Sequence, residues 1–261
     1  AKRRYALRDD QWERIANFLP RREGHVGGTA KDNRLFVEAV LYRYRAGIAW
    51  RDLPERFGDF RVVHTRHTRW SESGVWKRVF EHLAEDADNE YAMIDSTIAG
   101  PINMRQVPVK KGQETKDVRE QEAIGRSKGG LTTKIHATCD ALGNPTGFHL
   151  TPGQAHDLQG ADALLPSLLA DIKALLADKA YDARERVLDL LEKSGIQSVV
   201  PPKSNRIEQR EYDEDMYKIR HLIENFFAKL KQYRAIATRY DKRATNFLGA
   251  IYLAASVIWL N

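Results

Sequence analysis

The apolar residues of this chain change their spacing at Tyr91, and that change constrains the fold more than any other feature. Before Tyr91 they recur at the spacing of amphipathic helices, as Trp12 and Ile15 do. After it come short runs rich in β-branched and aromatic residues, which predict strands over residues 91–98, 131–139, 146–150, 172–177 and 196–200. Helices are expected between the later strands. This order predicts an α/β fold with a mixed five-stranded sheet and helices on both faces.

Residues 1–90 are predicted to form a separate all-helical domain of the helix-turn-helix type, followed by an α/β domain over residues 91–261. A short helix ends at Gly58, and a second one runs from about Phe60 to Trp70. Arginine, histidine and threonine dominate this second helix, and such side chains reach the phosphates and base edges of DNA. The expected DNA contacts are its three arginines, Arg61, Arg66 and Arg69. In the alternative interpretation the helix is only a solvated basic one that packs through Val62, Val63 and Trp70.

Composition narrows the class of partner and the compartment. The 261 residues carry a net charge of +6, which favours a polyanionic partner, nucleic acid first. Cys139 is the only cysteine, so an internal disulfide and a cysteine zinc cluster are excluded, and a reducing cytoplasm is expected. No apolar run reaches the roughly 18 residues of a membrane-spanning helix, and no secretory core is recognisable, so no membrane partner is expected.

Three acidic residues stand where a metal site would need them. Asp95 follows an apolar run in the expected first strand. Asp178 ends a second apolar run, that of the expected strand over residues 172–177, and Glu224 lies in an expected helix over residues 213–231. In the ribonuclease-H-like fold, which has this element order, these three elements converge at one edge. Carboxylate oxygens are natural ligands of Mg²⁺, and two such ions stabilise both the attacking and the leaving oxygen of a phosphoryl transfer. The alternatives are a strand-end Asp95 bonded to a hydroxyl and an Asp178 that merely starts a turn, with Asp182 as a lower-ranked rival carboxylate.

The expected long helix places charged residues on one stripe. With about 100° of rotation per residue, Tyr217, Arg220, Glu224 and Lys231 fall within about 60° of one another. The apolar stripe is centred about 120° away, so the helix buries one stripe while presenting Glu224 with two cations. Arg220 and Glu224 alone also fit an ordinary surface ion pair.

Five motifs occur in order along the chain: Asp95-Ser96-Thr97, Ile124-Gly-Arg-Ser-Lys-Gly-Gly-Leu-Thr-Thr-Lys134, Thr151-Pro-Gly-Gln-Ala-His-Asp157, Ala177-Asp-Lys-Ala-Tyr-Asp182 and Arg220-His-Leu-Ile-Glu-Asn-Phe-Phe227. Together they resemble the bacterial insertion-sequence transposases, and the likeness spans nearly the whole chain. It is to the Asp-Asp-Glu (DDE) class with the Tyr-Arg-Glu-Lys signature, in insertion-sequence family five.

The resemblance implies a DNA transposase with a ribonuclease-H-like DDE catalytic domain over residues 91–261. Within it, the polar and basic composition of residues 99–130 predicts a long basic loop. The resemblance also implies binding to terminal inverted repeats of the element, metal-dependent hydrolysis of the ends, and joining of the 3′-hydroxyls to target DNA. Mg²⁺ or Mn²⁺, as two ions, is implied as the cofactor, and a homodimer or larger assembly on double-stranded DNA at the bacterial nucleoid as the working form. By the resemblance, the metal ligands are Asp95, Asp178 and Glu224. The DNA contacts near the cut are Tyr217, Arg220 and Lys231, with Lys134 beside them.

The chain departs from the family pattern after its first motif. Members commonly continue with Val-Arg-Ala-His, whereas Ala99-Gly100-Pro101 follows here. Two alternatives therefore stay open at this point. One is an inactive or domesticated copy that binds DNA through residues 1–90, and the other is a nuclease of the same fold that cuts without joining, since fold alone does not determine function.

Overall fold

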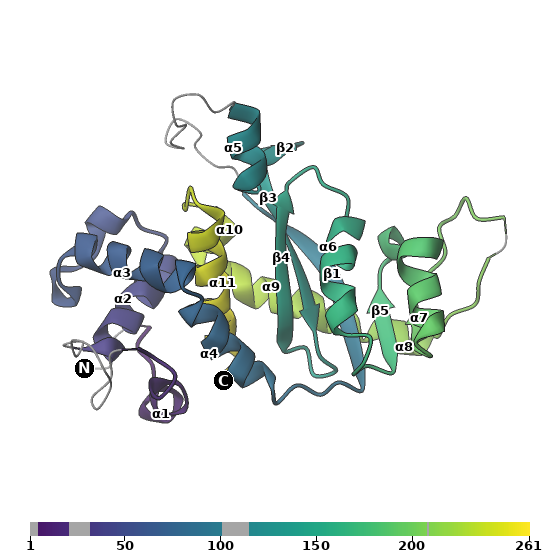
Figure 1. The fold of residues 1–261 in the computed structure, drawn as a ribbon, viewed down its shortest axis with the longest axis horizontal. Coiled ribbons are helices and arrows are strands. Elements are labelled where there is room, and N and C mark those ends of the chain that lie inside the picture. The colour runs from purple at the N-terminus through teal and green to yellow at the C-terminus, as the bar shows by residue number, and fades with distance from the viewer. Residues whose placement is uncertain (1–4, 21–31, 101–114, 208) are drawn as a thin grey trace. The chain divides into compact units, whose positions relative to one another are not determined.

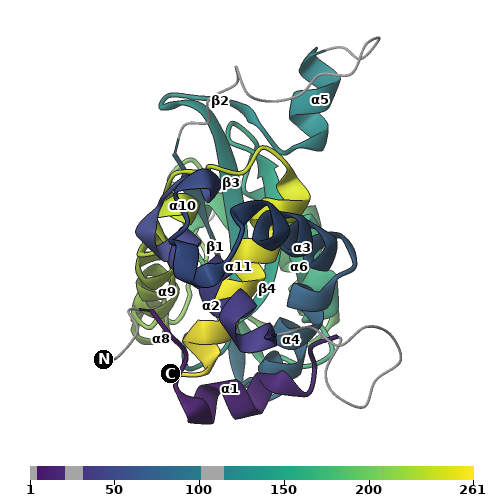
Figure 2. The same ribbon diagram turned by 90° about the vertical axis from the view of Figure 1, so that its left-hand side faces the viewer.

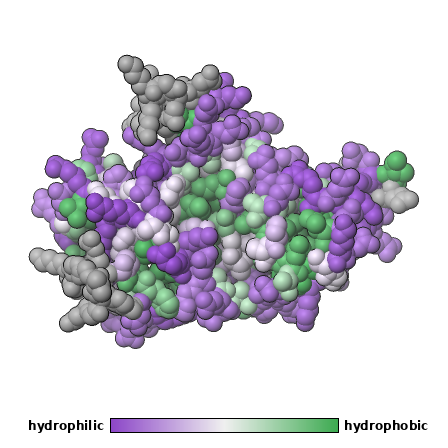
Figure 3. Space-filling view, in the orientation of Figure 1, coloured by the Kyte–Doolittle hydropathy of each residue, from purple (hydrophilic) through white to green (hydrophobic). Residues whose placement is uncertain are grey.

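The computed structural model describes residues 5–20, 32–100, 115–207 and 209–261, which form two compact units (Figure 1). Among the described residues, one unit comprises 5–85 and 229–261, and the other comprises 86–100 and 115–228. Hydrophilic residues cover much of the displayed surface of each unit (Figure 3). None of the helices in these ranges combines the length and apolarity that a membrane span requires.

The first unit is helical, as expected. Its elements are α1 (Asp9–Ala16), α2 (Asn33–Ala46), two 3₁₀ turns (Trp50–Asp52 and Glu55–Phe57), α3 (Phe60–Glu72), α4 (Val75–Ala84), α10 (Arg234–Ala237) and α11 (Ala244–Trp259). Gly58 ends the second 3₁₀ turn with φ at 85°, a left-handed conformation that glycine adopts without a side-chain clash. Asp59 then caps α3 by accepting a hydrogen bond from Arg61 N at 2.8 Å.

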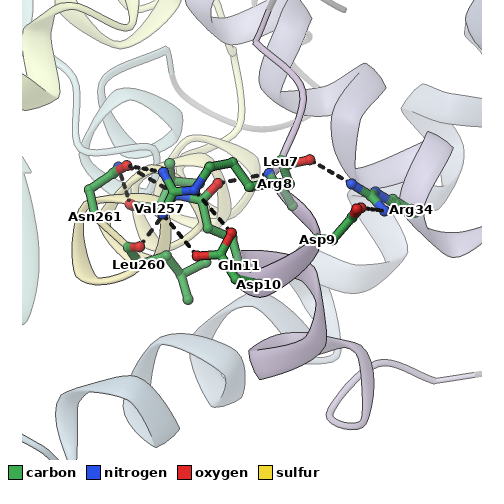
Figure 4. Close-up of polar contacts among 9 residues, drawn as sticks. All are labelled: Leu7, Arg8, Asp9, Asp10, Gln11, Arg34, Val257, Leu260 and Asn261. Atoms are coloured by element: carbon green, nitrogen blue, oxygen red, sulfur yellow. Dashed lines mark hydrogen bonds and ion pairs between the residues drawn. The ribbon is translucent and has the colours of Figure 1, made fainter. Parts of the chain in front are cut away.

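The last helix belongs to this unit and not to the sheet. α11 is apolar on all sides and packs against α3 and α4 (Figure 2), as expected of a helix that must be covered all round. The chain end is also tied to α1: Gln11 Nε2 donates to Leu260 O at 3.3 Å and to Asn261 Oδ1 at 3.1 Å (Figure 4). The expected division into residues 1–90 and 91–261 was therefore wrong for the C-terminal segment 229–261.

The second unit is built on a mixed sheet. Its strands are β1 (Tyr91–Ala99), β2 (Gly125–Ser127), β3 (Gly130–Cys139), β4 (Pro145–Pro152), β5 (Ala174–Ala177) and β6 (Gln197–Val199). β3 pairs antiparallel with β1, β2 and β4, whereas β5 lies parallel to β1 and β6 parallel to β5. The expected strands and the ribonuclease-H-like arrangement are confirmed. The short β2 is an addition that makes the sheet six-stranded.

Helices cover both faces of this sheet (Figures 1 and 2). Ala92 and Ile94 of β1 join a buried apolar cluster with α6 (Leu158–Leu164) and with α7 (Asp189–Lys193). The opposite face carries α8 (Glu214–Lys218) and α9 (His221–Lys231), where the ring of Phe226 lies 5.9 Å from that of Phe148. Because side chains alternate along a strand, the residue after Ile94 points toward the α9 face.

Two expected elements differ from the structure. The single helix over residues 213–231 is two helices, interrupted at Ile219 and Arg220. The expected loop over residues 99–130 contains α5 (Thr115–Gln121) and β2 in its described part. In both places the local sequence pattern does not determine the structure. The apolar spacing continues through the break between α8 and α9. The segment that forms α5 is polar except for the buried Val118.

Candidate active site

Asp95 lies in the middle of β1 with its carboxylate on the α9 face. Its Oδ1 accepts a hydrogen bond from Ser96 N at 2.7 Å, and its Oδ2 accepts one from Arg220 Nη1 at 2.6 Å. Only 20% of the side chain is exposed. Burial raises the pKa of this carboxyl, the charge of Asp178 raises it further, and the bonds from Ser96 and Arg220 only partly oppose them.

Asp178 is brought beside Asp95 by the strand register. β5 runs parallel to β1 with Ala177 opposite Ile94, so Asp178, just past the end of β5, comes next to Asp95 within β1. The carboxylate also caps the next turn, because Asp178 Oδ1 accepts a hydrogen bond from Ala180 N at 2.8 Å. The turn-forming interpretation and the site interpretation thus describe the same residue, and the first does not exclude the second.

Glu224 lies in the first turn of α9 and is linked to Asp95 through a third side chain. Arg220 Nη1 bonds Asp95, and Arg220 Nη2 forms an ion pair with Glu224 Oε1. Glu224 is 56% exposed, whereas Arg220 is only 16% exposed. Within the part of the chain that the structure describes, no three acidic, histidine or cysteine residues are grouped as metal ligands. The structure therefore pairs Asp95 with Asp178 and places a guanidinium between Asp95 and Glu224.

The remaining signature residues lie on the same two helices. The Arg220 guanidinium carbon lies 5.8 Å from the centre of the Tyr217 ring, which itself packs on Tyr212 at 5.6 Å. Lys231 is the last residue of α9, and burial lowers the pKa of its ammonium group. The predicted grouping of Tyr217, Arg220 and Glu224 is thus present locally, although a helix break separates the first from the last.

A second polar network lies on the other face of β1 and was not predicted. Ser96 Oγ donates to Asp157 Oδ1 at 2.5 Å, and Lys134 Nζ donates to the same oxygen at 3.1 Å and to Ala155 O at 2.6 Å. Burial opposes the charge of Asp157, but the bonds from Ser96 and Lys134 outweigh it and lower the pKa of this carboxyl. Asp157 occupies the N-cap position of α6, but its side chain makes no capping hydrogen bond to that helix.

This network changes what is expected of Lys134. Only 14% of its side chain is exposed, and its ammonium group is engaged by Asp157. Ser96, Lys134 and Asp157 line a cavity of about 500 Å³ together with Ser127 and Lys128 of the β2–β3 hairpin. The sequence signal for this cluster was the motif ending in Asp157, which gave no indication of which strand it would meet.

The three arginines of α3 differ in exposure to solvent and in their contacts within the protein. Arg61 and Arg69 are exposed, whereas the guanidinium of Arg66 stacks 4.1 Å from the ring of Phe36. Of the residues through which the alternative interpretation packs α3, Val63 and Trp70 are buried as expected, whereas Val62 is 66% exposed. The buried side is formed by Val63, His67 and Trp70.

Comparison with known proteins assigns the family. A family model described as "Transposase DDE domain" matches residues 105–259, and one described as "Putative transposase of IS4/5 family" matches residues 7–80. The "Putative transposase for insertion sequence element IS6501" of Brucella ovis is 41% identical over 133 residues, which cover 50% of this chain and 99% of the relative. The "Uncharacterized protein y4sN" of Sinorhizobium fredii is 52% identical over 92 residues, covering 35% of this chain and 74% of the relative.

The chain belongs to the DDE transposases of insertion sequences. A solved structure, the "Mos1 transposase paired-end complex with left transposon end", is similar with a TM-score of 0.27 at 12% identity, over 84% of this chain and 82% of that one. The family assignment rests on the sequence matches. Asp178 and Glu224 lie inside the matched DDE segment, and Asp95 precedes it.

DDE transposases use divalent metal ions, and the donor chemistry of this site fits such an ion. Asp95 and Asp178 bring two carboxylates, from adjacent parallel segments of the sheet, to a partly desolvated position, and hard cations prefer oxygen ligands. A cation would relieve the cost of charging Asp95, which burial and its acidic neighbour now increase.

Proposed function

We propose that this protein is an active transposase that binds the terminal inverted repeats of its own element, cleaves the element ends and joins the 3′-hydroxyls to target DNA. The observation that carries the proposal is the placement of Asp95 on β1 and of Asp178 directly after the parallel neighbour β5, with Glu224 linked to Asp95 through Arg220. A family match supports the same chemistry over residues 105–259.

In this proposal Asp95, Asp178 and Glu224 hold two ions of Mg²⁺ or Mn²⁺. When bound, the ions supply Lewis-acid stabilisation for the attacking and leaving oxygens of a phosphoryl transfer. The strands fix the two aspartates rigidly, whereas Glu224 projects from an exposed helical turn and adapts to the substrate. Both aspartates must be ionised to act as ligands.

Double-stranded DNA is the proposed partner, with a homodimer or larger assembly acting on paired ends. Arg61 and Arg69 are exposed on α3 and suit contacts to terminal repeats. Tyr217, Arg220 and Lys231 suit contacts to the strand being cut. Arg66 and Lys134 contribute by supporting the fold around these surfaces, since their charged groups are already bonded or stacked within the protein.

The test is strand cleavage and joining on a labelled duplex that carries the element's own end, with Mg²⁺ and with EDTA. We expect joined products from the wild type with Mg²⁺ only, and none from Glu224→Gln. Glu192→Gln is the matched control, because Glu192 is an exposed helical glutamate on α7. Binding without any cleavage would support the domesticated DNA-binding alternative, and cleavage without joining would support the nuclease alternative.

A further inference from the structure

One guanidinium bridges carboxylates from two separate elements of the proposed metal site. Arg220 donates to Asp95 on β1 and to Glu224 on α9, through different nitrogens. The planar fork of arginine is suited to such bridging, and a lysine ammonium is not. Because Asp95 is 20% exposed and Arg220 is 16% exposed, this ion pair is shielded from water more than a surface pair would be.

The bridge occupies the oxygens that a metal ion would need. Asp95 Oδ1 accepts a hydrogen bond from Ser96 N, and Asp95 Oδ2 accepts the one from Arg220. A divalent cation and the guanidinium therefore compete for the same oxygen, and like charges at one carboxylate repel each other. Arg220 thus stands where positive charge is needed, as an internal substitute for part of the metal's charge.

The backbone allows Arg220 to leave without unfolding a helix. Arg220 lies in the break between α8 and α9, where hydrogen bonds run from Leu222 N to Ile219 O and from Ile223 N to Arg220 O, at 3.0 and 3.2 Å. These are the shorter-range bonds of a 3₁₀ turn, which often marks a hinge. A departing guanidinium needs another anion, and a DNA phosphate offers the same bidentate geometry as a carboxylate.

We propose that Arg220 keeps the site closed to divalent cations in the DNA-free protein, and that a phosphate of bound DNA draws it away and opens the site. The identity of the anion rests on the proposed function; the competition between Arg220 and the metal does not. Linkage makes the effect reciprocal, so DNA strengthens metal binding as much as metal strengthens DNA binding. Such coupling confines metal loading, and with it strand cleavage, to the DNA-bound enzyme.

The test measures Mn²⁺ binding to the full chain without DNA, from the electron paramagnetic resonance signal of the free ion. We expect Arg220→Gln to lower the Kd for Mn²⁺ by about tenfold, within the usual range of coupling between two ligands. Arg206→Gln is the matched control, because Arg206 also pairs with a carboxylate, that of Asp182, in the same unit. It should bind Mn²⁺ like the wild type. Adding Asp95→Asn to Arg220→Gln should abolish the gain.

A second arm adds a short duplex of arbitrary sequence at low salt, after subtraction of the Mn²⁺ that the duplex alone binds. The duplex should lower the Kd of the wild type and leave that of Arg220→Gln unchanged. Arg220→Lys keeps the charge but cannot bridge the two carboxylates, so its Kd for Mn²⁺ should lie between those of the wild type and Arg220→Gln. If Arg220→Gln does not fold, the Kd of Arg220→Lys tests the inference.

An unchanged or raised Kd in both Arg220 variants would overturn the inference. Because the Mn²⁺ affinity is measured without any cleavage, the inference and the proposed function can fail independently of each other. Failure of strand joining with a tenfold gain in Mn²⁺ affinity would leave the inference standing. Intact strand joining without the gain in Mn²⁺ affinity would overturn the inference about Arg220 and leave the proposed function standing.

Discussion

Arg220 donates a hydrogen bond of 2.6 Å to Asp95, a residue 125 positions earlier in the chain. The same guanidinium pairs with Glu224 one helical turn later. Helical spacing predicted the second contact, because residues four apart share a face. The first contact needs the sheet and the helix break together, and it is the one that connects two candidate metal ligands.

Replacing Asp178 by Asn tests whether the paired aspartates act as a unit. We expect strand joining to fall by at least about a hundredfold, because the loss of one ligand weakens a Lewis acid that contributes several kcal/mol. The fold should remain, since an asparagine oxygen can still accept the hydrogen bond from Ala180 N. Joining assays with Mg²⁺ and circular dichroism on the same preparation check both parts. Activity near that of the wild type would remove Asp178 from the site.

Replacing Asp182 by Asn tests whether this carboxylate, the lower-ranked alternative to Asp178, stabilises the fold. Its side chain is fully buried and accepts hydrogen bonds from Lys203 N and Arg206 Nε at 2.9 Å and from Arg210 Nη1 at 3.3 Å. We expect the free energy of unfolding to fall by about 1–3 kcal/mol at neutral pH, since charged partners lose their acceptor. Urea unfolding measures this.

The pH dependence of the Asp182 effect follows from its lowered pKa. Burial raises the pKa of Asp182, but the bonds from Arg206, Lys203 and Arg210 outweigh it and lower the value below the ordinary 3.8. The folded state therefore releases the proton more readily than the unfolded state. The stabilisation is present above pH 3.8 and disappears as the pH falls through the folded value. A difference between wild type and Asp182→Asn that grew on acidification would contradict this.

Two buried histidines predict a loss of stability in mild acid. Burial lowers the pKa of both His67 and His136 from 6.5 to about 4. Between these values the unfolded chain binds protons that the folded chain does not, so stability falls as the pH falls from 6.5 toward 4. Each histidine contributes up to about 3 kcal/mol to this loss.

Urea unfolding at a series of pH values measures the slope. His136→Gln should reduce the slope in that window, because Gln does not titrate and keeps a partner for Thr151 Oγ1, now 2.8 Å from His136 Nε2. An equal slope in His136→Gln would show that other groups cause the acid effect.

Local patterns predicted the sheet well because each strand carries its own signal. That β5 lies beside β1, which places Asp178 next to Asp95, was expected from the element order of the ribonuclease-H-like fold and not from any local pattern. The break at Arg220 was not predictable, because the apolar spacing of residues 213–231 continues across it. Ser96 and Asp157 meet across 61 residues, and no periodicity encodes that contact.

The last helix shows a different limit. An apolar α11 had to be buried somewhere, but its sequence does not say whether the sheet or the N-terminal helices cover it. Contacts such as Asn246 Nδ2 to Thr68 Oγ1 at 2.9 Å decide the matter only in three dimensions. Domain boundaries drawn along the chain fail where a terminal segment returns to an earlier unit.

Tyr181 provides a stability prediction with an unusual sign. Its side chain is fully buried, and its hydroxyl has no hydrogen-bond partner within the described ranges of the chain. Burial, followed by the charges of Asp95, Asp157 and Asp178, raises the pKa of this phenol far above its ordinary value. An unsatisfied buried hydroxyl costs about 1–3 kcal/mol, so Tyr181→Phe should raise the free energy of unfolding by about 1 kcal/mol.

Tyr44→Phe is the matched control, because the Tyr44 hydroxyl is equally buried but bonded. It donates to Asp241 Oδ2 at 2.7 Å and lies 3.0 Å from His67 Nε2. Removing it leaves both partners short of a bond, so stability should fall by about 1–3 kcal/mol. Urea unfolding of the two variants side by side gives the comparison. A loss of stability in Tyr181→Phe as large as that in Tyr44→Phe would mean that the Tyr181 hydroxyl has a bonding partner in solution.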